Sequence, residues 1–359
     1  MELHAAFTRH GPFLRRRDLL ALGHSDRGIR AALAAGLIFR VRHGWYALPG
    51  TPDDAVRAIR LGGRLAGASA LLSYGCIVPR PERTEIVVPC NACRLRRPDD
   101  RRARLRAADR CRIRWVDDYR GDEREWRVSV EEAIAQVLRG EPRSVAIACC
   151  DAAIRKGLIG WNELDRLFAE GPARARPWRE LVTGKADAFG ETYVMLGCHA
   201  AGIPFVPQPY VPGAGRFDGQ IGKHVYTEID GIQHAEDYDG VLGGVSAFES
   251  DHDRDVTMAI RGDRVLRFTY RQILTDWDRC LAAMLRAIAD DELLSRARAR
   301  RPYVPPSRRR STRLGRPRST RRGTSGAASA NGAAPAAGAA SAPVSPGGQA
   351  IREAPKARR

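Results

Sequence analysis

Apolar positions in residues 1–50 first recur at helical spacing and then gather in two short β-prone runs. The pattern predicts two helices followed by two strands: residues 14–22, 26–35, 37–42 and 45–48. Ser25 stands where the second helix needs an N-cap, and Gly36 stands where that helix ends. His43-Gly44 between the two runs predicts a tight hairpin. A helix, a turn, a helix and a hairpin in this order predict a winged helix-turn-helix.

The polar positions of this unit are largely basic. If its second helix lies in a major groove, Arg27 and Arg30 point outward toward the DNA. The wing adds three basic side chains that would meet phosphates or the minor groove: Arg40, Arg42 and His43. Residues 1–50 therefore predict a DNA-binding unit.

Two short motifs of this unit, Gly36-Leu37 and Gly44-Trp45-Tyr46, resemble the N-terminal domain of the AbiEi-type antitoxin family. The resemblance implies a DNA-binding antitoxin or transcriptional repressor with a partner protein encoded in the same operon. An alternative stays open, because winged helices also serve as packing or protein-contact modules.

Residues 51–185 predict a mixed α/β part followed by a helical connecting region. The expected elements are helices at 53–61, 66–74, 129–138, 145–155 and 161–168, and a strand at 85–88. Residues 90–114 are dominated by arginine, so we expect an exposed loop there. Asp151 and Arg155, four positions apart on one helix, predict a surface ion pair.

The eight cysteines are scattered along the chain and fit small buried apolar positions in a reducing compartment. A structural zinc site is the alternative. Cys90 and Cys93 have the spacing of a zinc knuckle, and Cys76 and Cys111 could complete a set of four thiolates. The irregular spacing of these last two weighs against zinc.

Residues 186–295 predict a further domain with the element order α-β-β-β-α-β-α. The expected elements are helices at 189–201, 247–260 and 270–288, and strands at 208–211, 215–219, 225–230 and 264–268. Gly222 marks a hairpin turn between the second and third strands.

Three carboxylates gather on the two strands of this hairpin. Glu228 and Asp230 are two positions apart and share one face, and Asp218 lies on the neighbouring strand. Carboxylates this close repel, and their burial is costly unless a cation neutralises them. All-oxygen ligation favours Mg²⁺ or Mn²⁺, which in nucleases polarise a phosphoryl oxygen and generate a nucleophilic water. The hairpin therefore predicts a metal-dependent hydrolytic site.

The motifs of this domain resemble an uncharacterised family related to very-short-patch-repair endonucleases, within the PD-(D/E)xK nuclease superfamily. They occur in this order: Gly215-Arg216-Phe217-Asp218, Glu228-Ile229-Asp230-Gly231-x-x-His234, Phe248-x-x-Asp251-x-x-Arg254-Asp255 and Val265-Leu266-Arg267-Phe268. The resemblance implies that Asp218 and Glu228 ligate a metal and that Glu191, on the preceding helix, supports them. It also implies that Asp230 and His234 replace the usual final lysine of the superfamily. His234 could activate water or protonate a leaving group.

Further residues are expected beside this site. Lys223, on the hairpin, is a candidate for a migrated lysine. Asp251 and Asp255 lie four positions apart on a helix, so either could orient His234, while Arg254 could meet a phosphate. The alternative is a solvated helix face with an internal ion pair.

The net charge of +18 changes the picture mainly at the C-terminus. Residues 301–359 hold thirteen Lys and Arg against one Glu, which is +12 of the total. Because Pro, Ala, Gly and Ser dominate there, we expect residues 296–359 to be a disordered basic tail that contacts phosphates without sequence preference. The chain lacks both an apolar run of membrane-spanning length and a secretory segment, which predicts a cytoplasmic protein.

Together these features predict an α+β protein of four parts. They are a winged helix at 1–50, a connecting region at 51–185, a restriction-endonuclease-like domain at 186–295 and the tail at 296–359. The favoured function is a Mg²⁺- or Mn²⁺-dependent DNA endonuclease that the winged helix directs to DNA, in repair, phage defence or a toxin-antitoxin system. The alternative is an AbiEi-type antitoxin or repressor whose nuclease fold is inactive.

Overall fold

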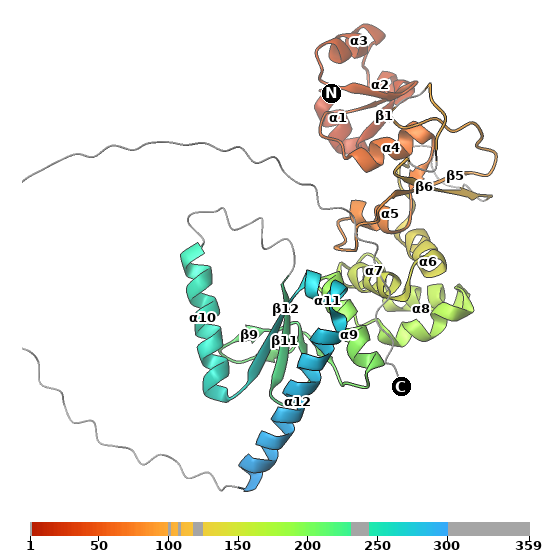
Figure 1. The fold of residues 1–359 in the computed structure, drawn as a ribbon. Coiled ribbons are helices and arrows are strands. Elements are labelled where there is room, and N and C mark those ends of the chain that lie inside the picture. The colour runs from red at the N-terminus through yellow and green to blue at the C-terminus, as the bar shows by residue number, and fades with distance from the viewer. Residues whose placement is uncertain (1, 100–101, 107–108, 118–124, 231–243, 301–359) are drawn as a thin grey trace, which may run out of the picture. The chain divides into compact units, whose positions relative to one another are not determined.

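The computed structural model of the protein describes residues 2–99, 102–106, 109–117, 125–230 and 244–300. For residues 244–251 and 297–300 the description is limited to the backbone. The structure combines many helices with several small sheets (Figure 1), which is compatible with an α+β protein. In the part of the chain that the structure describes, no helix is both long and apolar enough to span a membrane.

Residues 2–50 form three helices around a three-stranded antiparallel sheet of order β1-β3-β2 (Figure 1). The elements are α1 (Leu3–His10), β1 (Phe13–Arg15), α2 (Arg16–Ala21), α3 (Asp26–Ala34), β2 (Phe39–Arg42) and β3 (Trp45–Ala47). An apolar core of its own holds this unit together: Ala6, Phe7, Leu14, Leu19, Ile29, Ala32, Ile38 and Tyr46. Ser25 caps α3 as predicted, because its Oγ accepts a hydrogen bond from the Gly28 amide at 3.1 Å.

The first helix predicted in this unit, at residues 14–22, is shorter in the structure. Its expected start pairs with the wing instead, since Leu14 lies opposite Tyr46 and Arg15 opposite Trp45 in the β1–β3 ladder. The helix then begins at Arg16, whose amide donates to the Gly44 carbonyl at 2.8 Å. The turn of the wing is thereby fixed to the start of α2.

The next part of the chain is a second small sheet with two helices. Its elements are α4 (Asp53–Leu61), β4 (Arg64–Leu65), α5 (Gly67–Ser73), β5 (Thr84–Pro89) and β6 (Cys111–Val116), and the sheet order is β4-β5-β6. The predicted exposed loop at 90–114 was wrong at its end, because Cys111 begins a strand parallel to β5. Ile113 is partly buried, and its neighbours Arg112 and Arg114 are polar. The segment has the alternating pattern of a strand, but its many arginines led to the prediction of a loop.

A helical region follows, made of α6 (Val130–Gly140), α7 (Arg143–Arg155), α8 (Trp161–Glu170) and the 3₁₀ helix η1 (Ala173–Leu181). The predicted surface pair of Asp151 and Arg155 was wrong. Asp151 is 1 % exposed and accepts hydrogen bonds from the amides of Thr183 at 2.8 Å and Gly184 at 2.5 Å. Arg155 pairs with Asp187 instead. The partners of Asp151 are two amides of the turn at 183–184, which lies far beyond α7 in the chain. The sequence of α7 alone therefore could not predict them.

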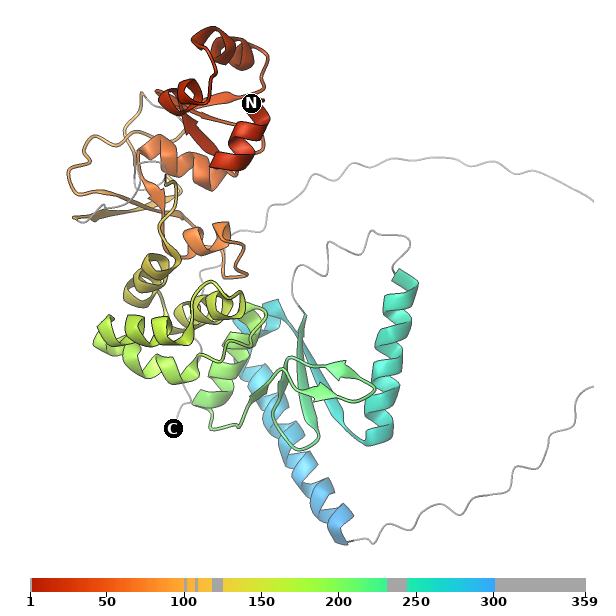
Figure 2. The same ribbon diagram turned by 180° about the vertical axis from the view of Figure 1, so that it is seen from behind.

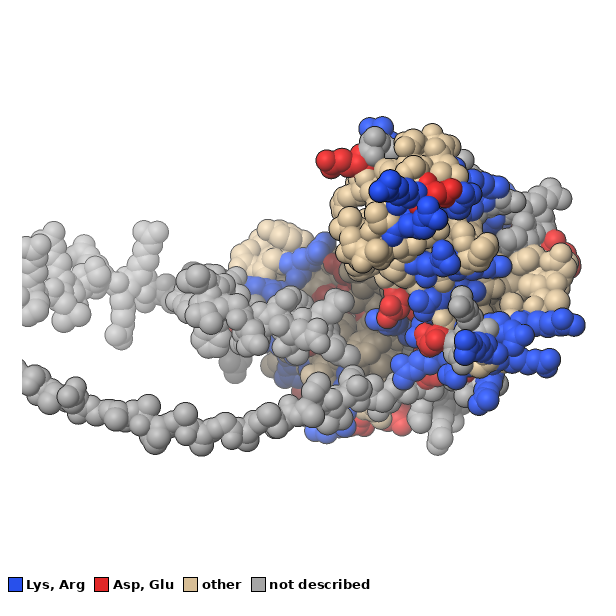
Figure 3. All heavy atoms as spheres, turned by 90° about the horizontal axis from the view of Figure 1, so that it is seen from above, with Lys and Arg blue, Asp and Glu red and all other residues tan. Residues whose placement is uncertain are grey.

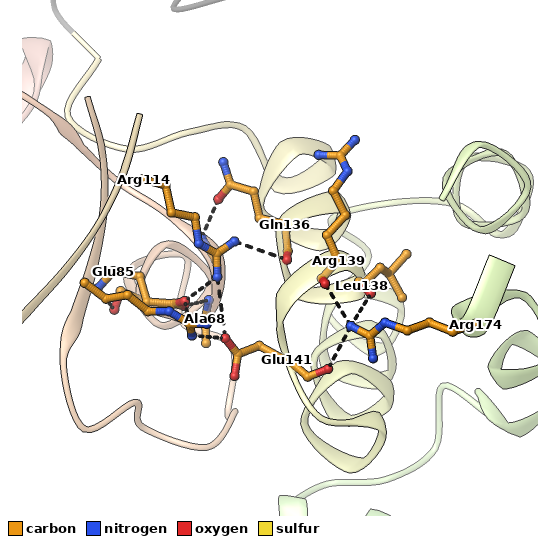
Figure 4. A network of polar contacts seen from close by, with 11 residues as sticks. Ala68, Glu85, Arg114, Gln136, Leu138, Arg139, Glu141 and Arg174 are labelled. Carbon is orange, nitrogen blue, oxygen red and sulfur yellow. Dashed lines mark hydrogen bonds and ion pairs between the residues drawn. The ribbon is translucent and has the colours of Figure 1, made fainter. Parts of the chain in front are cut away.

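A buried carboxylate joins the second sheet to this helical region (Figure 4). Glu85 of β5 is 1 % exposed, and its side chain accepts from the Ala68 amide at 2.7 Å and from Arg114 Nη2 at 2.9 Å. Arg114 also donates to the Gln136 carbonyl of α6 at 3.2 Å. Burial raises the pKa of Glu85, while Arg114 acts in the opposite direction. One charged pair therefore ties α5, β5, β6 and α6 together.

The C-terminal part, described up to residue 300, is built on a four-stranded sheet of order β12-β11-β10-β7. Its elements are α9 (Phe189–Ala200), β7 (Val206–Pro207), β8 (Tyr210–Val211), β9 (Gly215–Arg216), β10 (Gly219–Gln220), β11 (Val225–Asp230), α10 (Gly244–Arg261), β12 (Arg264–Thr269), α11 (Tyr270–Thr275) and α12 (Trp277–Arg300). β10 and β11 form an antiparallel hairpin, and β12 runs parallel to β11. The single strand expected at 215–219 was wrong, because β9 pairs with β8 in a separate sheet and Asp218 lies between β9 and β10. α10 lies on one side of this sheet and α9 and α12 lie on the other (Figures 1 and 2).

The single helix predicted at 270–288 is two helices. Thr269 caps α11 with a capping box, and the chain leaves helical geometry at Asp276, where φ is −139°. Trp277 then starts α12 and packs its ring edge to face against Tyr193 of α9, at 5.9 Å between centroids. The break lets the chain turn while both helices keep an apolar side toward α9.

Candidate functional site

α3 buries one side in the core of the N-terminal unit and exposes the other. Ile29 and Ala32 are buried, whereas Arg27 and Arg30 are exposed. Asp26, in the first turn, accepts from Arg16 Nε at 2.7 Å, and this bond lowers the pKa of Asp26. The first turn of α3 is therefore fixed to α2, while the arginines that follow face solvent.

The wing presents the other predicted contacts at its surface, since Arg40, Arg42 and His43 are all exposed. Arg42 lies against the end of α4, where a Cβ on Gly62 would come within 2.3 Å of Arg42 Nη1. Gly62 has φ +77°, which suits glycine. All five basic residues predicted for DNA contact are thus exposed on α3 or on the wing.

In the C-terminal part, Asp218 stands between β9 and β10 and binds the neighbouring strand. Its Oδ2 accepts a hydrogen bond from the Ile229 amide of β11 at 2.6 Å. Burial raises the pKa of Asp218, and the negative charges of Glu228 and Asp230 raise it further. The structure therefore brings Asp218 beside β11, as the hairpin pattern predicted.

Glu191 joins the same group from the first turn of α9. It is 6 % exposed and accepts from Gln208 Nε2 at 2.6 Å and from the Asp187 amide at 3.1 Å. Burial, followed by the charge of Asp218, raises the pKa of Glu191 to about 8. At neutral pH this carboxyl group is therefore largely protonated.

Glu228 is neutralised by two arginines. Its Oε1 accepts from Arg254 Nη2 at 2.6 Å and its Oε2 from Arg267 Nε at 2.8 Å. Arg254, on α10, also donates to the carbonyls of Ala214 and Arg216 at 2.7 and 3.0 Å. Both carboxylate oxygens of Glu228 thus take part in ion pairs with side chains held by other elements.

The second of these arginines bridges to α10. Arg267 donates through Nη1 and Nη2 to Asp255 at 3.2 and 2.7 Å, and this carboxylate is the main cause of the raised pKa of Arg267. Asp255 therefore has a described partner in β12. Asp251 lies on α10, but its side chain is outside the described atoms, and His234 lies outside the described residues.

The carboxylates of Asp218 and Glu228 have the right chemistry to bind a hard divalent cation, but they are not arranged as a formed metal site. Carboxylate oxygens suit Mg²⁺ and Mn²⁺. Among the described residues, however, no three Asp, Glu, His or Cys side chains are placed to hold a metal ion. A cation at Asp218 and Glu228 would have to replace at least one arginine contact of Glu228.

Two predicted site residues lie at the margins. Asp230 is exposed at the end of β11, next to the carboxylates. Lys223 is exposed in the β10–β11 turn, at the opposite end of the hairpin from Asp218 and Glu228. Glu228 lies five positions after Lys223, which is roughly 16 Å of extended backbone, so the structure does not bring this lysine to the acids.

Residues 2–49 match the family described as "Transcriptional regulator, AbiEi antitoxin". The N-terminal unit thus resembles an AbiEi antitoxin. No curated protein matches the chain. Among solved structures, the RV2827C protein from Mycobacterium tuberculosis matches at 16 % identity, over 54 % of this chain and 78 % of that chain, with a TM-score of 0.26. The AbiEi match ends before the acidic residues, so it supports the N-terminal prediction alone.

We call residues 2–49 the AbiEi-like unit. Outside this unit, the sequence did not predict that Gln208 binds Glu191 or that Arg267 binds Glu228. Gln208 has φ +54°, a strained conformation for a residue with a side chain. Its amide donates to the Asp218 carbonyl at 3.2 Å while its side chain reaches Glu191. Two flanking prolines, Pro207 and Pro209, were the available signal of a fixed backbone at this position.

The four cysteines considered for zinc differ in their surroundings. Cys76 and Cys111 are buried, while Cys90 and Cys93 are exposed. Burial raises the pKa of the Cys76 and Cys111 thiols, which favours the neutral form. In the described part of the chain they form no metal-binding group. The expectation of buried cysteines is confirmed for six of the eight and is wrong for Cys90 and Cys93.

Proposed function

We propose that the protein binds duplex DNA through its AbiEi-like unit and acts as a transcriptional regulator of the antitoxin type. This proposal rests on one observation: α3 is buried on one side and exposed on the other. Ile29 and Ala32 anchor the helix in the core, which leaves Arg27 and Arg30 facing outward from a fixed position. Outward arginines on the second helix of a helix-turn-helix are the side chains that reach base edges in a major groove.

The wing extends the same surface. Its exposed side chains carry positive charge beside α3 and suit phosphate contacts: Arg40 and Arg42, with His43 at the turn. The bond between the Arg16 amide and the Gly44 carbonyl fixes the wing to α2. Helix and wing are therefore positioned before DNA arrives, which lowers the conformational cost of binding.

Selection from a pool of random duplexes tests this function directly. Full-length protein should enrich one sequence motif from the pool at physiological salt, because base-edge contacts discriminate among sequences. The motif should be lost in the Arg27→Ala/Arg30→Ala variant. Retention of duplexes without any enriched motif by the wild-type protein would refute sequence-directed binding.

The antitoxin family match also suggests a partner. An antitoxin acts on a toxin, so we propose that a toxin gene neighbours this gene and that its product binds this chain. Inspection of the neighbouring genes, followed by copurification of the neighbour's product, tests the proposal. A chromosomal context with no conserved adjacent gene would argue against it.

A second candidate function is hydrolysis of DNA at the acidic group. Glu191 is buried and Asp218 is partly buried, and the charge of Asp218 raises the pKa of Glu191. A bound cation would relieve this repulsion. Asp218 and Glu228 would hold Mg²⁺ or Mn²⁺, with Glu191 and Asp230 beside them. The metal would polarise a phosphoryl oxygen and supply a nucleophilic water.

The arginines that hold Glu228 fit the same proposal. Arg254 and Arg267 bring positive charge to the carboxylates from α10 and β12. Guanidinium groups bind phosphate oxygens as readily as carboxylate oxygens. Either arginine could therefore bind a scissile phosphate when Glu228 turns to a cation. His234 remains the proposed proton carrier.

Cleavage assays decide this second candidate. Full-length protein is incubated with supercoiled and mismatch-bearing DNA, with Mg²⁺, with Mn²⁺ or with excess chelator. We expect metal-dependent cutting that Asp218→Asn and Glu228→Gln each abolish, while the exposed Asp278→Asn serves as a matched control. Absence of cutting by the wild type, or equal cutting by Asp218→Asn, would refute the nuclease assignment and leave the regulator function standing.

A further inference from the structure

The arginine-rich segment after β5 folds back on itself as a short antiparallel hairpin. Arg96 and Arg104 form a β-bridge. Backbone hydrogen bonds continue on both sides of it, from the Arg97 amide to the Ala103 carbonyl at 3.0 Å and from the Leu105 amide to the Leu95 carbonyl at 2.9 Å. We call residues 94–99 and 102–106 the arginine hairpin.

The arginine hairpin has two unlike faces. Leu95 and Leu105 are partly buried and pack against the main apolar core. Four arginines at positions that alternate with these leucines are exposed: Arg96, Arg102, Arg104 and Arg106. Because successive side chains of a strand point to opposite faces, these four arginines form one outward face.

The acids of this segment neutralise other arginines. Asp99 lies within ion-pair distance of Arg57 and Arg60 of α4, and Asp109 accepts from Arg97 Nε at 2.9 Å. Among the described residues, no carboxylate lies within ion-pair distance of Arg96 or Arg104, and Arg96 Nη1 donates to the Arg102 carbonyl at 3.1 Å. Like charges directly opposite each other on paired strands destabilise the pairing. The outward face is thus costly to the isolated protein and suited to a polyanion.

The hairpin is anchored to α4, the helix against which the wing also rests. Arg60 Nη1 donates to the Pro98 carbonyl at 3.0 Å, near the tip of the hairpin. At the end of the same helix, Gly62 accommodates the guanidinium of Arg42 from the wing. Trp115 Nε1 donates to the Ala92 carbonyl at 3.0 Å and fixes the base. Figure 3 shows Lys and Arg side chains outnumbering Asp and Glu on the face seen from above.

We propose that the outward face of the arginine hairpin contacts the phosphate backbone of the duplex that the AbiEi-like unit binds. The inference rests on the proposed DNA-binding function and assigns it a second, sequence-independent contact. Guanidinium groups bind phosphate oxygens bidentately, and each neutralised phosphate releases counterions. The hairpin therefore adds affinity and salt dependence, while α3 determines the sequence.

The test compares full-length wild-type protein with Arg96→Ala/Arg104→Ala on the duplex selected above. Affinity is measured over a range of salt concentrations. The matched control is Arg279→Ala/Arg286→Ala, which removes the same charge from side chains of α12 that are 82 % and 80 % exposed. If each hairpin arginine meets one phosphate, the slope of log affinity against log salt falls by about 1.8, since each contact contributes about 0.9. The control slope and the selected motif should stay unchanged.

Two further variants and measurements separate the explanations. Arg96→Lys/Arg104→Lys keeps the charge and should restore most of the slope. Without DNA, the alanine variant should melt no lower than wild type, because it removes a repulsive pair. An unchanged slope in the alanine variant would overturn the inference and favour an acidic protein as the partner of the hairpin. Failure of the wild type to bind any duplex would overturn the proposed function as well.

Discussion

Asp151 shows how one buried carboxylate couples stability to pH. Its Oδ1 accepts the amides of Thr183 and Gly184, and its Oδ2 is buried without a described hydrogen-bond partner. Burial raises the pKa of Asp151 to about 6, against an ordinary value of 3.8, although the two amides act in the opposite direction. The folded state therefore holds this proton more tightly than the unfolded state does.

The sign of the pH effect follows from this difference. Because the folded pKa is raised, the stabilising contribution is complete below pH 4 and is lost as pH rises through about 6. Asp151→Asn keeps an acceptor for the amides but cannot titrate. Relative to Asp151→Asn, the wild type should lose on the order of 2 kcal/mol of unfolding free energy between pH 4.5 and pH 7. Urea titrations of both proteins at the two pH values measure this, and a pH-independent difference would contradict it.

At the scale of elements, Glu85 joins four of them. Its carboxylate accepts hydrogen bonds from the Ala68 amide of α5 and from the guanidinium of Arg114 of β6, which in turn donates to α6. A Cβ on Gly67 would come within 2.4 Å of Glu85 Oε2, so the helix start and this carboxylate are closely fitted. This pair, rather than apolar contact alone, sets the position of the sheet against the helix.

Glu85→Ala should therefore destabilise the protein strongly. Removing one partner of a buried ion pair costs about 3 to 5 kcal/mol. We expect a loss near the lower value, because Arg114 is 22 % exposed and keeps its contact with Glu141 at 3.5 Å. The amide of Ala68 loses its acceptor and should exchange with solvent faster. Glu82→Ala, at an exposed position just before β5, is the control and should change stability by less than about 0.5 kcal/mol. Denaturant titration with hydrogen exchange makes the comparison, and equal stability of the two variants would refute the structural role.

The elements that the sequence predicted well are those with local signals. Helices α3, α4, α6 and α9 have apolar periodicity and clear ends, so their predicted bounds agree with the structure within one or two residues. Strand β6 was missed because arginine alternates with its apolar positions. The hairpin of β10 and β11 was found because its turn is local.

The candidate site, too, was predicted only where its contacts are local in the sequence. The neighbourhood of Asp218 and β11 followed from hairpin geometry, which is local. The pairing of Glu228 with Arg254 and Arg267 could not be predicted, because those residues come from α10 and β12, far along the chain. Long-range contacts of this kind have no periodic signature in the sequence.

At the scale of the whole molecule, positive charge is concentrated outside the described residues. Residues 301–359 carry +12 of the net charge of +18. Truncation after residue 300 should lower non-specific duplex affinity and flatten its salt dependence, since each lost phosphate contact removes about 0.9 from the slope. The selected motif should persist, because Arg27 and Arg30 are retained. Salt titrations of full-length and truncated protein check this, and equal slopes would show that the segment makes no phosphate contacts.

The central claim is that α3 of the AbiEi-like unit reads DNA. The most direct measurement is the affinity of full-length Arg27→Ala/Arg30→Ala for the selected duplex and for a scrambled one, beside the Arg279→Ala/Arg286→Ala control. We predict that affinity for the selected duplex falls by at least about 30-fold, because two lost base contacts at about 1 to 3 kcal/mol each sum to about 2 to 6 kcal/mol, while affinity for the scrambled duplex changes much less. Equal affinity of this variant and the control for the selected duplex would contradict the claim.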